Sequence, residues 1–575
     1  MKKLLSVFLA AVMLVCTFSV ASFAGDDADL VFAVASDLHY NKPREQLEGP
    51  TNVEETMPLN EDPIYWYANR RAAMEDESGF IIDEFLEQCK EKQNGEYVYD
   101  YVLIPGDMAD SGKTMSDDHR AVAEKLKAFK DETGIPVYVI DGNHDCGLDC
   151  DTTPEVFKEI YADFGMNYAT GDDLSYTADL GEKYRLIALD SCAYDKSTED
   201  GMNAAKVKWV LDEAKQAKED GREPILMMHH NLLDHLPLQR ILSRNFIVKF
   251  HYSTAELFAD AGIRIVLTGH EHCSDSTSYT SALGNTIYDF ANTSLTMYPL
   301  QYKTFTFTES QIKYETKTIS SIDTDALQSA VSGYSQEQIN LMNEDLNEYA
   351  KGFLKAGVQY RLEIGLTEEK LGIAEDSVFY DLVMGAVGIL REILNAPLYG
   401  DENSVEAKAA EYGIEIPATP YTTGWDLATD LVAAHYAGEE AYNLDGPEIT
   451  ALLRTAAYII REEFIFLNDD VLFSAADAIL ANFGYDGLGE MIVKDYAVYG
   501  AINPAEYFIV ALASPILYQF AYDDDGVSDN DGVIEINGDS DFNVLNNELP
   551  GFLQSILQKL QYIIHYIVRL GDIIK

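Results

Sequence analysis

The chain has 575 residues, of which 47% are apolar and 24% are charged. These are the proportions of folded globular proteins, so they exclude a wholly disordered or a collagenous chain. Lysine and arginine number 41 against 97 aspartate and glutamate residues, which gives a formal net charge of −56. Because so acidic a surface repels phosphate backbones and anionic headgroups, nucleic-acid binding by a basic face is excluded. An anionic substrate therefore needs a local source of positive charge, such as a metal ion.

The first 24 residues have the pattern of an export signal. Lys2 and Lys3 precede an apolar run over residues 4–20, and residues 22–24 (Ser-Phe-Ala) place small side chains where a signal peptidase requires them. We predict a signal peptide over 1–24 and a secreted, extracellular protein, with an uncleaved anchor as the alternative. No later stretch reaches about 18 unbroken apolar residues, so no transmembrane segment is expected after the signal.

The first half of the chain alternates short β-branched runs with helical stretches. Helices are expected over residues 121–130 and 204–218, between runs that have the length and composition of strands. Strand, helix and strand in series are typical of an α/β domain with a largely buried sheet. Three further runs, over 286–291, 303–308 and 311–318, predict an antiparallel ribbon that closes the domain. The other runs expected to form strands are 30–34, 101–104, 137–140, 185–189, 225–228 and 264–267.

From about residue 325 the sequence becomes helical. Residues 335–338 (Ser-Gln-Glu-Gln) form a capping box at a helix start, and β-type alternation is almost absent beyond them. We therefore predict an α/β domain over residues 25–322 and a mostly α-helical domain over residues 323–545.

Two segments near the end of the chain have patterns of their own. Residues 523–532 form an oxygen-rich loop that resembles acidic calcium-binding loops without the EF-hand register, so calcium at 523–531 and a solvated acidic linker both stay open. Residues 546–575 carry apolar side chains at three-and-four spacing, which predicts an amphipathic helix. Its apolar face can dock on its own domain, self-associate with a second copy or bind a membrane surface, and the scarcity of basic residues disfavours the membrane.

Residue types that bind metals follow five of the expected strands. Because the carboxyl ends of parallel strands share one edge of a sheet, these side chains are expected to meet at one place. Gly106, Gly142 and Gly269 allow tight turns there. In chain order the residues are Asp37, His39, Asp107, Asp110, Asn143, His144, Asp145, His229, His230, His270 and His272.

The chemistry of this edge follows from the residue types. Imidazole and carboxylate ligands without thiolate suit first-row metals such as Zn, Mn or Fe. Seven ligand side chains are too many for one tetrahedral site and suit two metal ions that share a bridging carboxylate. Two metals about 3.5–4 Å apart hold two phosphate oxygens and lower the pKa of a shared water. The sequence therefore predicts a two-metal site that supplies the positive charge missing elsewhere.

The five blocks resemble those of the calcineurin-like metallophosphoesterases, in the same order and with plausible spacing. The resemblance covers residues 29 to about 310 and not the helical half. It implies two facing mixed β-sheets flanked by helices, and a phosphoric ester hydrolase in which a metal-bridging hydroxide attacks phosphorus in line. The blocks are Asp37-x-His39, Gly106-Asp107-x-x-Asp110, Gly142-Asn143-His144-Asp145, His229 and Gly269-His270-x-His272.

The resemblance also implies a role for each residue. Asp107 bridges the two metals, His144 contacts the phosphate and protonates the leaving oxygen, and Asp145 orients His144. The remaining ligands of the first metal are Asp37, His39 and His272, and those of the second metal are Asn143, His229 and His270.

Three points stay open at this stage. The fourth block contains two adjacent histidines, and we take His229 as the ligand because it lies nearer the strand, with His230 behind it. Asp110 either supports the site or caps a helix. Five cysteines follow the signal peptide, too few and odd in number for a disulfide framework, although the spacing of Cys146 and Cys150 allows a bridge.

These observations predict a secreted, dinuclear metal-dependent phosphoesterase that acts on a small phosphate ester, with phosphodiesters or nucleotides favoured. The alternative is a non-catalytic exported surface-binding protein with a degenerate domain. The complete ligand set argues against this alternative, because decayed sites usually lose a ligand. A nuclease is disfavoured by the acidic charge.

Overall fold

The computed structural model describes residues 28–43, 74–363 except 172, 196–198, 236–238 and 240–244, then 384–451 with several short gaps, and 526–536. The predicted signal peptide over 1–24 and the predicted amphipathic helix over 546–575 lie outside the described residues. Within the described ranges, no helix has both the length and the apolar character that crossing a membrane requires.

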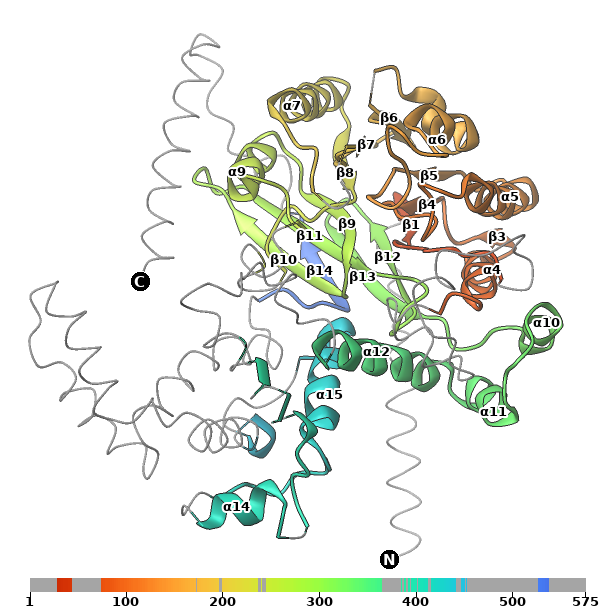
Figure 1. Ribbon diagram of the computed structural model, residues 1–575. Helices are drawn as coiled ribbons and strands as arrows, with labels where there is room; N and C mark the ends of the chain where they lie inside the picture. Colours follow the sequence, from red (N-terminus) through yellow and green to blue (C-terminus); the bar gives the residue numbers. More distant parts are fainter. Residues whose placement is uncertain are drawn as a thin grey trace, which may run out of the picture.

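Two six-stranded mixed sheets form the centre of the protein (Figure 1). The first sheet consists, in spatial order, of β14 (Asp531–Glu535), β13 (Gln311–Thr318), β12 (Gln301–Phe307), β1 (Leu30–Val34), β4 (Tyr101–Ile104) and β5 (Val137–Val139). The second consists of β10 (Asp275–Thr280), β11 (Thr286–Thr293), β9 (Ile265–His272), β8 (Glu223–Met228), β7 (Tyr184–Leu189) and β6 (Tyr176–Leu180). Strands β1, β4 and β5 are parallel, as are β7, β8, β9 and β11. A short hairpin joins β2 (Lys92–Gln93) to β3 (Glu96–Tyr97).

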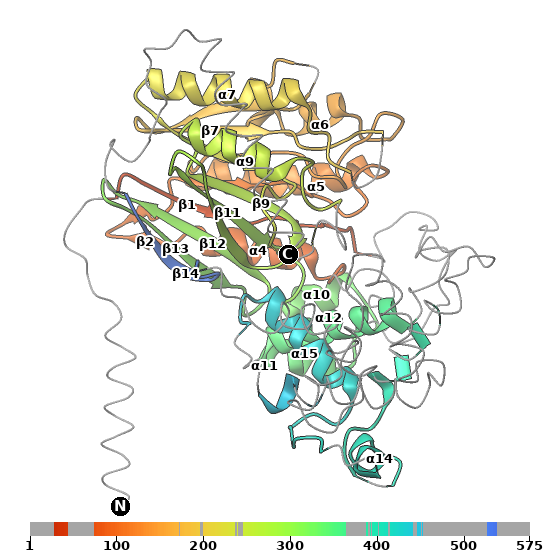
Figure 2. The same ribbon diagram turned by 90° about the vertical axis from the view of Figure 1, so that its left-hand side faces the viewer.

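Helices flank both sheets (Figures 1 and 2). On the side of β4 and β5 lie α4 (Ser78–Gln88), α5 (Ser116–Thr133) and α6 (Pro154–Ile160), followed by the 3₁₀ turns Ala162–Phe164 and Met166–Tyr168. On the side of the second sheet lie α7 (Ala204–Glu219) and α9 (His251–Asp260), which pack on β7, β8, β10 and β11. The predicted fold, two facing mixed sheets flanked by helices, is confirmed.

The central strands are buried on both faces, which explains their unbroken apolar runs. In β7, Leu186 and Ala188 belong to the large core that the two sheets share. Ile187 and Leu189 belong to a second apolar cluster beneath α7 and α9. Because successive side chains of a strand point to opposite faces, one strand contributes to both cores.

The predicted ribbon over residues 286–318 is wrong in one respect. Of the three predicted runs, only β12 and β13 pair with each other, antiparallel in the first sheet, whereas β11 lies in the second sheet between β9 and β10. Between β11 and β12 the chain crosses from one sheet to the other past the end of β1, where Leu295 N donates to Ser36 O at 3.0 Å. The chain therefore passes from the second sheet to the first close to the edge where the metal-binding residues were expected.

The described residues after 323 are mostly helical, as predicted. They include α10 (Thr324–Ala330), α11 (Gln336–Glu344), α12 (Leu346–Glu363), α14 (Val405–Glu411) and α15 (Gly424–Tyr436), and the predicted capping box at Ser335 is present. Strand β14 departs from this pattern. Although it lies inside the predicted helical domain over 323–545, it pairs antiparallel with β13 and forms the edge of the first sheet.

Candidate metal centre

Both sheets deliver side chains to one edge of the molecule. Asp37 and His39 follow β1, Asp107 follows β4 and Asn143 follows β5, all in the first sheet. The second sheet contributes His229, directly after β8, and His270 and His272, which are among the last three residues of strand β9. Hydrogen bonds join the loops, because Asp37 N donates to Gly106 O at 3.1 Å and His39 N donates to Asp107 O at 3.0 Å.

Backbone strain is concentrated at this edge. Of the eight non-glycine residues with positive φ in the described chain, five are predicted metal ligands. Each left-handed residue other than glycine costs of order 1–3 kcal/mol, so such a cluster is typical of a functional site whose surroundings impose the conformation. The five are Asp37, His39, Asp107, His270 and His272, with φ of 50°, 38°, 50°, 71° and 65°.

Two glycines allow the carboxylates to approach the neighbouring loops. A Cβ atom at Gly142 would lie 2.2 Å from Asp107 Oδ1, and one at Gly269 would lie 2.3 Å from Asp37 Oδ2. Any side chain at either position would push a carboxylate out of the site. The glycines of the third and fifth blocks are therefore required by packing against the carboxylates.

The first cluster contains Asp37, His39 and His272. Their facing atoms lie close together: His272 Nε2 is 3.0 Å from Asp37 Oδ1 and 3.1 Å from His39 Nε2. On the far side of the rings, the carboxylate oxygen Oδ1 of Asp110 lies 3.4 Å from His39 Nδ1, and Met297 Sδ lies 3.2 Å from His272 Nδ1. With the ring protons on the far nitrogens, the facing nitrogens present lone pairs.

The second cluster contains Asn143, His229 and His270. His229 Nδ1 donates to the carbonyl of Pro105 at 2.9 Å, so Nε2 is the ring nitrogen that could bind a cation. Nε2 faces Asn143 Oδ1 at 3.0 Å and Asp107 Oδ2 at 3.3 Å. His270 stacks beside His229 with 4.7 Å between the ring centroids, and burial together with His230 and His229 holds the pKa of His270 well below its ordinary value, so its ring is neutral.

Asp107 lies between the two clusters. Its Oδ1 accepts a hydrogen bond from His144 N at 2.7 Å, while Oδ2 lies 3.3 Å from His229 Nε2 and 3.7 Å from His39 Nε2. Burial raises the pKa of Asp107, but His229 and His144 outweigh it and lower the pKa well below the ordinary value. Burial lowers the pKa of His229, but Asp107 outweighs it and raises the pKa to about 10, so without a bound cation the Nε2 atom that faces Asp107 carries a proton. The carboxylate of Asp107 is therefore ionised, and positive charge in either cluster stabilises it.

The donor set fits two metal ions. In each cluster, ring nitrogens and carboxylate or amide oxygens converge, and a bound cation would take the place of the ring protons that lie between them. Asp107 Oδ2 is buried and accepts no hydrogen bond within the described structure. The side chains also form two groups with ligand atoms within 4.8 Å, one of Asp37, His39, Asp107 and His272 and one of Asp107, His229 and His270. Nitrogen and oxygen donors without thiolate suit Zn, Mn or Fe.

Comparison with known proteins agrees with this geometry. Residues 30–274 match the model of the calcineurin-like phosphoesterase family. The predicted resemblance to this family is therefore confirmed over these residues. No protein of curated function matches the chain.

Three solved structures are similar to about half of the chain. A dimetal phosphatase from Danio rerio is 12% identical, covers 51% of this chain and 97% of its own, and has a TM-score of 0.36. A conserved uncharacterized protein from Streptococcus pneumoniae, a predicted phosphoesterase, is 12% identical, covers 50% and 89%, and has a TM-score of 0.21. Vacuolar protein sorting 29 from Cryptosporidium parvum is 11% identical, covers 51% and 93%, and has a TM-score of 0.20.

The phosphoesterase domain gives His144 and Asp145 different partners from those predicted. His144 Nδ1 donates to the backbone carbonyl of Asp110 at 2.8 Å, and the His144 ring lies edge-on to His39 with 5.0 Å between centroids. Asp145 instead accepts from the backbone N–H groups of Met108 at 2.8 Å and Gly142 at 2.7 Å. Asp145 thus ties the second block to the third, and Asp110 holds the ring of His144.

Contacts bear on two other open points. His230 Nδ1 lies 2.9 Å from Ser191 Oγ, and the assignment of His229 as the ligand stays a prediction. All five cysteines after residue 24 are free, so the allowed Cys146–Cys150 bridge is absent. A buried group of Asp141, Asp190 and Cys192 lies nearby, and Lys206 Nζ, 3.2 Å from Asp190 Oδ2, supplies its positive charge.

Sequence reasoning missed two parts of the site. Met297, on the crossing between the sheets, contacts His272, and the ring of Phe246 stacks on His270 with 4.3 Å between centroids. The carbonyl of Asn245 lies 3.4 Å from His270 Nε2. None of these residues belongs to a metal-binding type or to a motif, so no signal in the sequence marks them.

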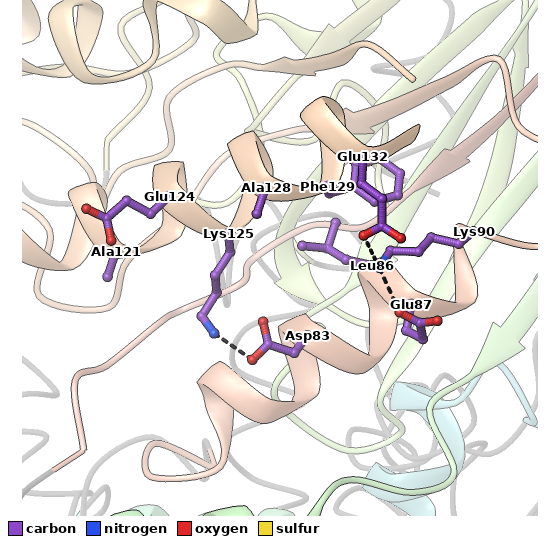
Figure 3. A pocket seen from close by; sticks show the side chains of 10 residues that line it. All are labelled: Asp83, Leu86, Glu87, Lys90, Ala121, Glu124, Lys125, Ala128, Phe129 and Glu132. Carbon is purple, nitrogen blue, oxygen red and sulfur yellow. Dashed lines mark hydrogen bonds and ion pairs between the residues drawn. The ribbon is translucent and has the colours of Figure 1, made fainter. Parts of the chain in front are cut away.

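The pocket in Figure 3 is separate from this site. It lies between α4 and α5, and no predicted metal ligand lines it. Two ion pairs span it, from Lys125 to Asp83 at 2.7 Å and from Lys90 to Glu132 at 2.8 Å. These contacts hold the two helices together.

Proposed function

We propose that the protein is an exported, two-metal phosphoesterase that hydrolyses small phosphate esters, with phosphodiesters or nucleotides favoured. One observation carries the proposal: the Oδ2 atom of Asp107 is shared by two separate clusters of nitrogen and oxygen donors. The complete ligand set supports a catalytic protein over a non-catalytic binding protein. Export is supported by Lys2, Lys3 and the apolar run over residues 4–20.

Two carboxylates of the chain, Asp107 and Asp37, serve binding, and His144 serves proton transfer. When bound, two metal ions would hold phosphate oxygens and lower the pKa of a water molecule. Asp107 holds the two positions together, because its Oδ1 is fixed by His144 N at 2.7 Å while Oδ2 faces both clusters. The hydrogen bond of Asp37 Oδ2 with Ser36 Oγ, at 2.6 Å, fixes the second carboxylate in the same way.

His144 is placed to act as the general acid. The Nδ1 proton is committed to the carbonyl of Asp110, so Nε2 is the atom through which a proton reaches the leaving oxygen. The His144 side chain is partly exposed, unlike the buried His39 beside it, and can therefore meet a substrate. Proton transfer of this kind contributes roughly 10²–10⁴-fold to a rate.

Metal analysis and a substrate panel test the proposal. The purified protein is loaded separately with Zn²⁺, Mn²⁺ or Fe²⁺, its metal content is measured, and nitrophenyl monoesters, nitrophenyl diesters and nucleotides are offered. We expect two metal ions per chain and turnover of at least one class of ester. Two bound metals without turnover of any ester would favour the non-catalytic binding protein. Failure to bind a second metal would contradict the two-metal site itself.

A further inference from the structure

The turn that carries His270 and His272 is held from outside by the C-terminal part of the chain. Figure 2 shows α12 and α15 at one end of the two sheets, with β14 along the edge of the first sheet. Residues just before β14 and just after α15 meet at Ser274, two residues beyond His272. Segments more than 150 residues from the metal-binding motif in sequence therefore reach its last turn.

Asn530 lies at the centre of this junction. Its Oδ1 accepts a hydrogen bond from Ser274 Oγ at 3.0 Å. Its Nδ2 donates to the carbonyls of Ala437 at 2.8 Å and Gly438 at 3.0 Å, which follow α15. The backbone N–H of Ser274 in turn donates to Tyr436 O at 3.0 Å. One amide side chain thus joins the helical part to the metal-binding turn.

The neighbouring Asp529 fixes Asn530 in place. Its Oδ1 accepts from the backbone N–H of Ser276 at 2.9 Å, and its carbonyl accepts from Lys303 Nζ at 2.8 Å. Lys303 is almost fully buried, with an exposed fraction of 2%, and a buried ammonium is stable only where its protons have acceptors. In the acidic segment over residues 523–532, which resembles a calcium-binding loop, Asp529 and Asn530 therefore bind groups of the protein itself.

Met297 connects the helical part to His272 itself. Its Sδ lies 3.2 Å from His272 Nδ1. Its side chain also packs with Leu354 of α12 and Ala433 of α15 in a small buried apolar cluster. A shift of α12 and α15 would therefore move the group that accepts the Nδ1 proton of His272.

We propose that Asn530 is a positioning residue for His272, so that the C-terminal part of the chain is a structural component of the metal site. The inference rests on the proposed two-metal function. The distance of 3.0 Å between His272 Nε2 and Asp37 Oδ1 is set by where the turn lies, and the Asn530 junction fixes the turn at Ser274. Groups that orient a ligand in this way are worth roughly 10- to 100-fold in metal affinity.

The test compares metal affinity in three single variants of the full-length protein. Asn530→Ala removes the junction, and Ser274→Ala removes the hydroxyl that donates to Asn530 and accepts from Lys303 Nζ. The matched control is Gln311→Ala, which removes a hydrogen bond of 2.9 Å between β13 and β14 at the other end of the same strand pair. Zn²⁺ affinity is measured by chelator competition, and the melting temperature of each metal-free variant is recorded.

We expect Asn530→Ala to bind at least one Zn²⁺ roughly 10- to 100-fold more weakly, with Gln311→Ala unchanged. The double variant of Asn530 and Ser274 should lose less affinity than the sum of the two single losses, because the two residues share one contact. If Asn530→Ala fails to fold, Ser274→Ala decides by the same measurement.

Three results would overturn the inference. These are unchanged Zn²⁺ affinity with a lowered melting temperature, an equal loss of affinity in Gln311→Ala, and additive losses in the double variant. Wild-type protein that does not bind two metals would instead contradict the proposed function, so the two failures are distinguishable.

Discussion

Replacing Asp107 by asparagine tests the centre of the site with the smallest change of shape. Asp107 Oδ1 accepts from His144 N, and an asparagine can satisfy that donor only with its own oxygen. Its NH₂ group must then take the position of Oδ2, 3.3 Å from His229 Nε2 and 3.7 Å from His39 Nε2. A neutral hydrogen-bond donor would thus occupy the point where both clusters present lone pairs to a cation.

The magnitude follows from the position of Asp107 between the two clusters. Removing a group that only orients a ligand costs roughly 10- to 100-fold in metal affinity. Asp107 itself faces both clusters, so the loss should reach at least about 100-fold for one metal, or about 2.7 kcal/mol at 1.36 kcal/mol per factor of ten. Turnover at a fixed metal concentration should fall by at least about two orders of magnitude, because the fully loaded fraction falls with the affinity.

The assay measures metal content after gel filtration together with turnover of a nitrophenyl ester. Asp179→Asn is the matched control, since it removes the same charge from an aspartate that pairs with Arg185 at 2.7 Å on the surface. Exposed pairs contribute only about 0–1 kcal/mol, so the control should keep its metals and its activity. An Asp107→Asn protein with two metals per chain and near-normal turnover would refute the bridging role.

Three further predictions follow from the same structure. His144→Ala should keep both metals and lose roughly 10²–10⁴-fold in rate, with a smaller loss for esters of good leaving groups, and an equal loss on all esters would contradict proton donation. Burial and Asp76 raise the pKa of Glu77 to about 7, so wild-type stability should fall by about 3 kcal/mol as the pH rises from about 4.5 to above 7. Glu77→Gln should remove this fall in urea denaturation, and parallel curves for the two proteins would show that Glu77 does not titrate there. Chelation should lower the melting temperature, with about 2.7 kcal/mol lost if metal had been present at 100 times its dissociation constant, and an unchanged melting temperature would contradict metal binding by the folded state.

The positions of the metal-binding residues could be read from local pattern. The strands at residues 30–34 and 101–104 are where the sequence predicted them, and Asp37 and Asp107 follow them. Such features are local, because a β-branched run followed by glycine and a polar residue determines a strand and its turn with little help from the rest of the chain. The seven predicted ligands meet for the same reason, since parallel strands end at one edge. Their roles as ligands stay predictions.

The partners of the side chains around the ligands could not be read in this way. Asp145 is adjacent to His144, yet its carboxylate accepts from Met108 N and Gly142 N. The ring of His144 is held by the carbonyl of Asp110, a role that was predicted for Asp145. Adjacency in sequence predicts which loop a residue lies on. It does not predict which of several nearby donors a buried carboxylate accepts from, because the packing of the neighbouring loops decides that.

The sequence by itself determined the α/β architecture, the helical second half and the edge at which histidine and aspartate gather. Only the tertiary structure decided that β11 joins the second sheet, that β14 returns from the helical half to pair with β13, and that Asn530 meets Ser274. The physical reason is the range of the interactions. Periodicity and turn chemistry act over a few residues, whereas a strand edge or a buried amide accepts any partner of the right geometry. Which distant segment supplies that partner depends on how the whole chain packs.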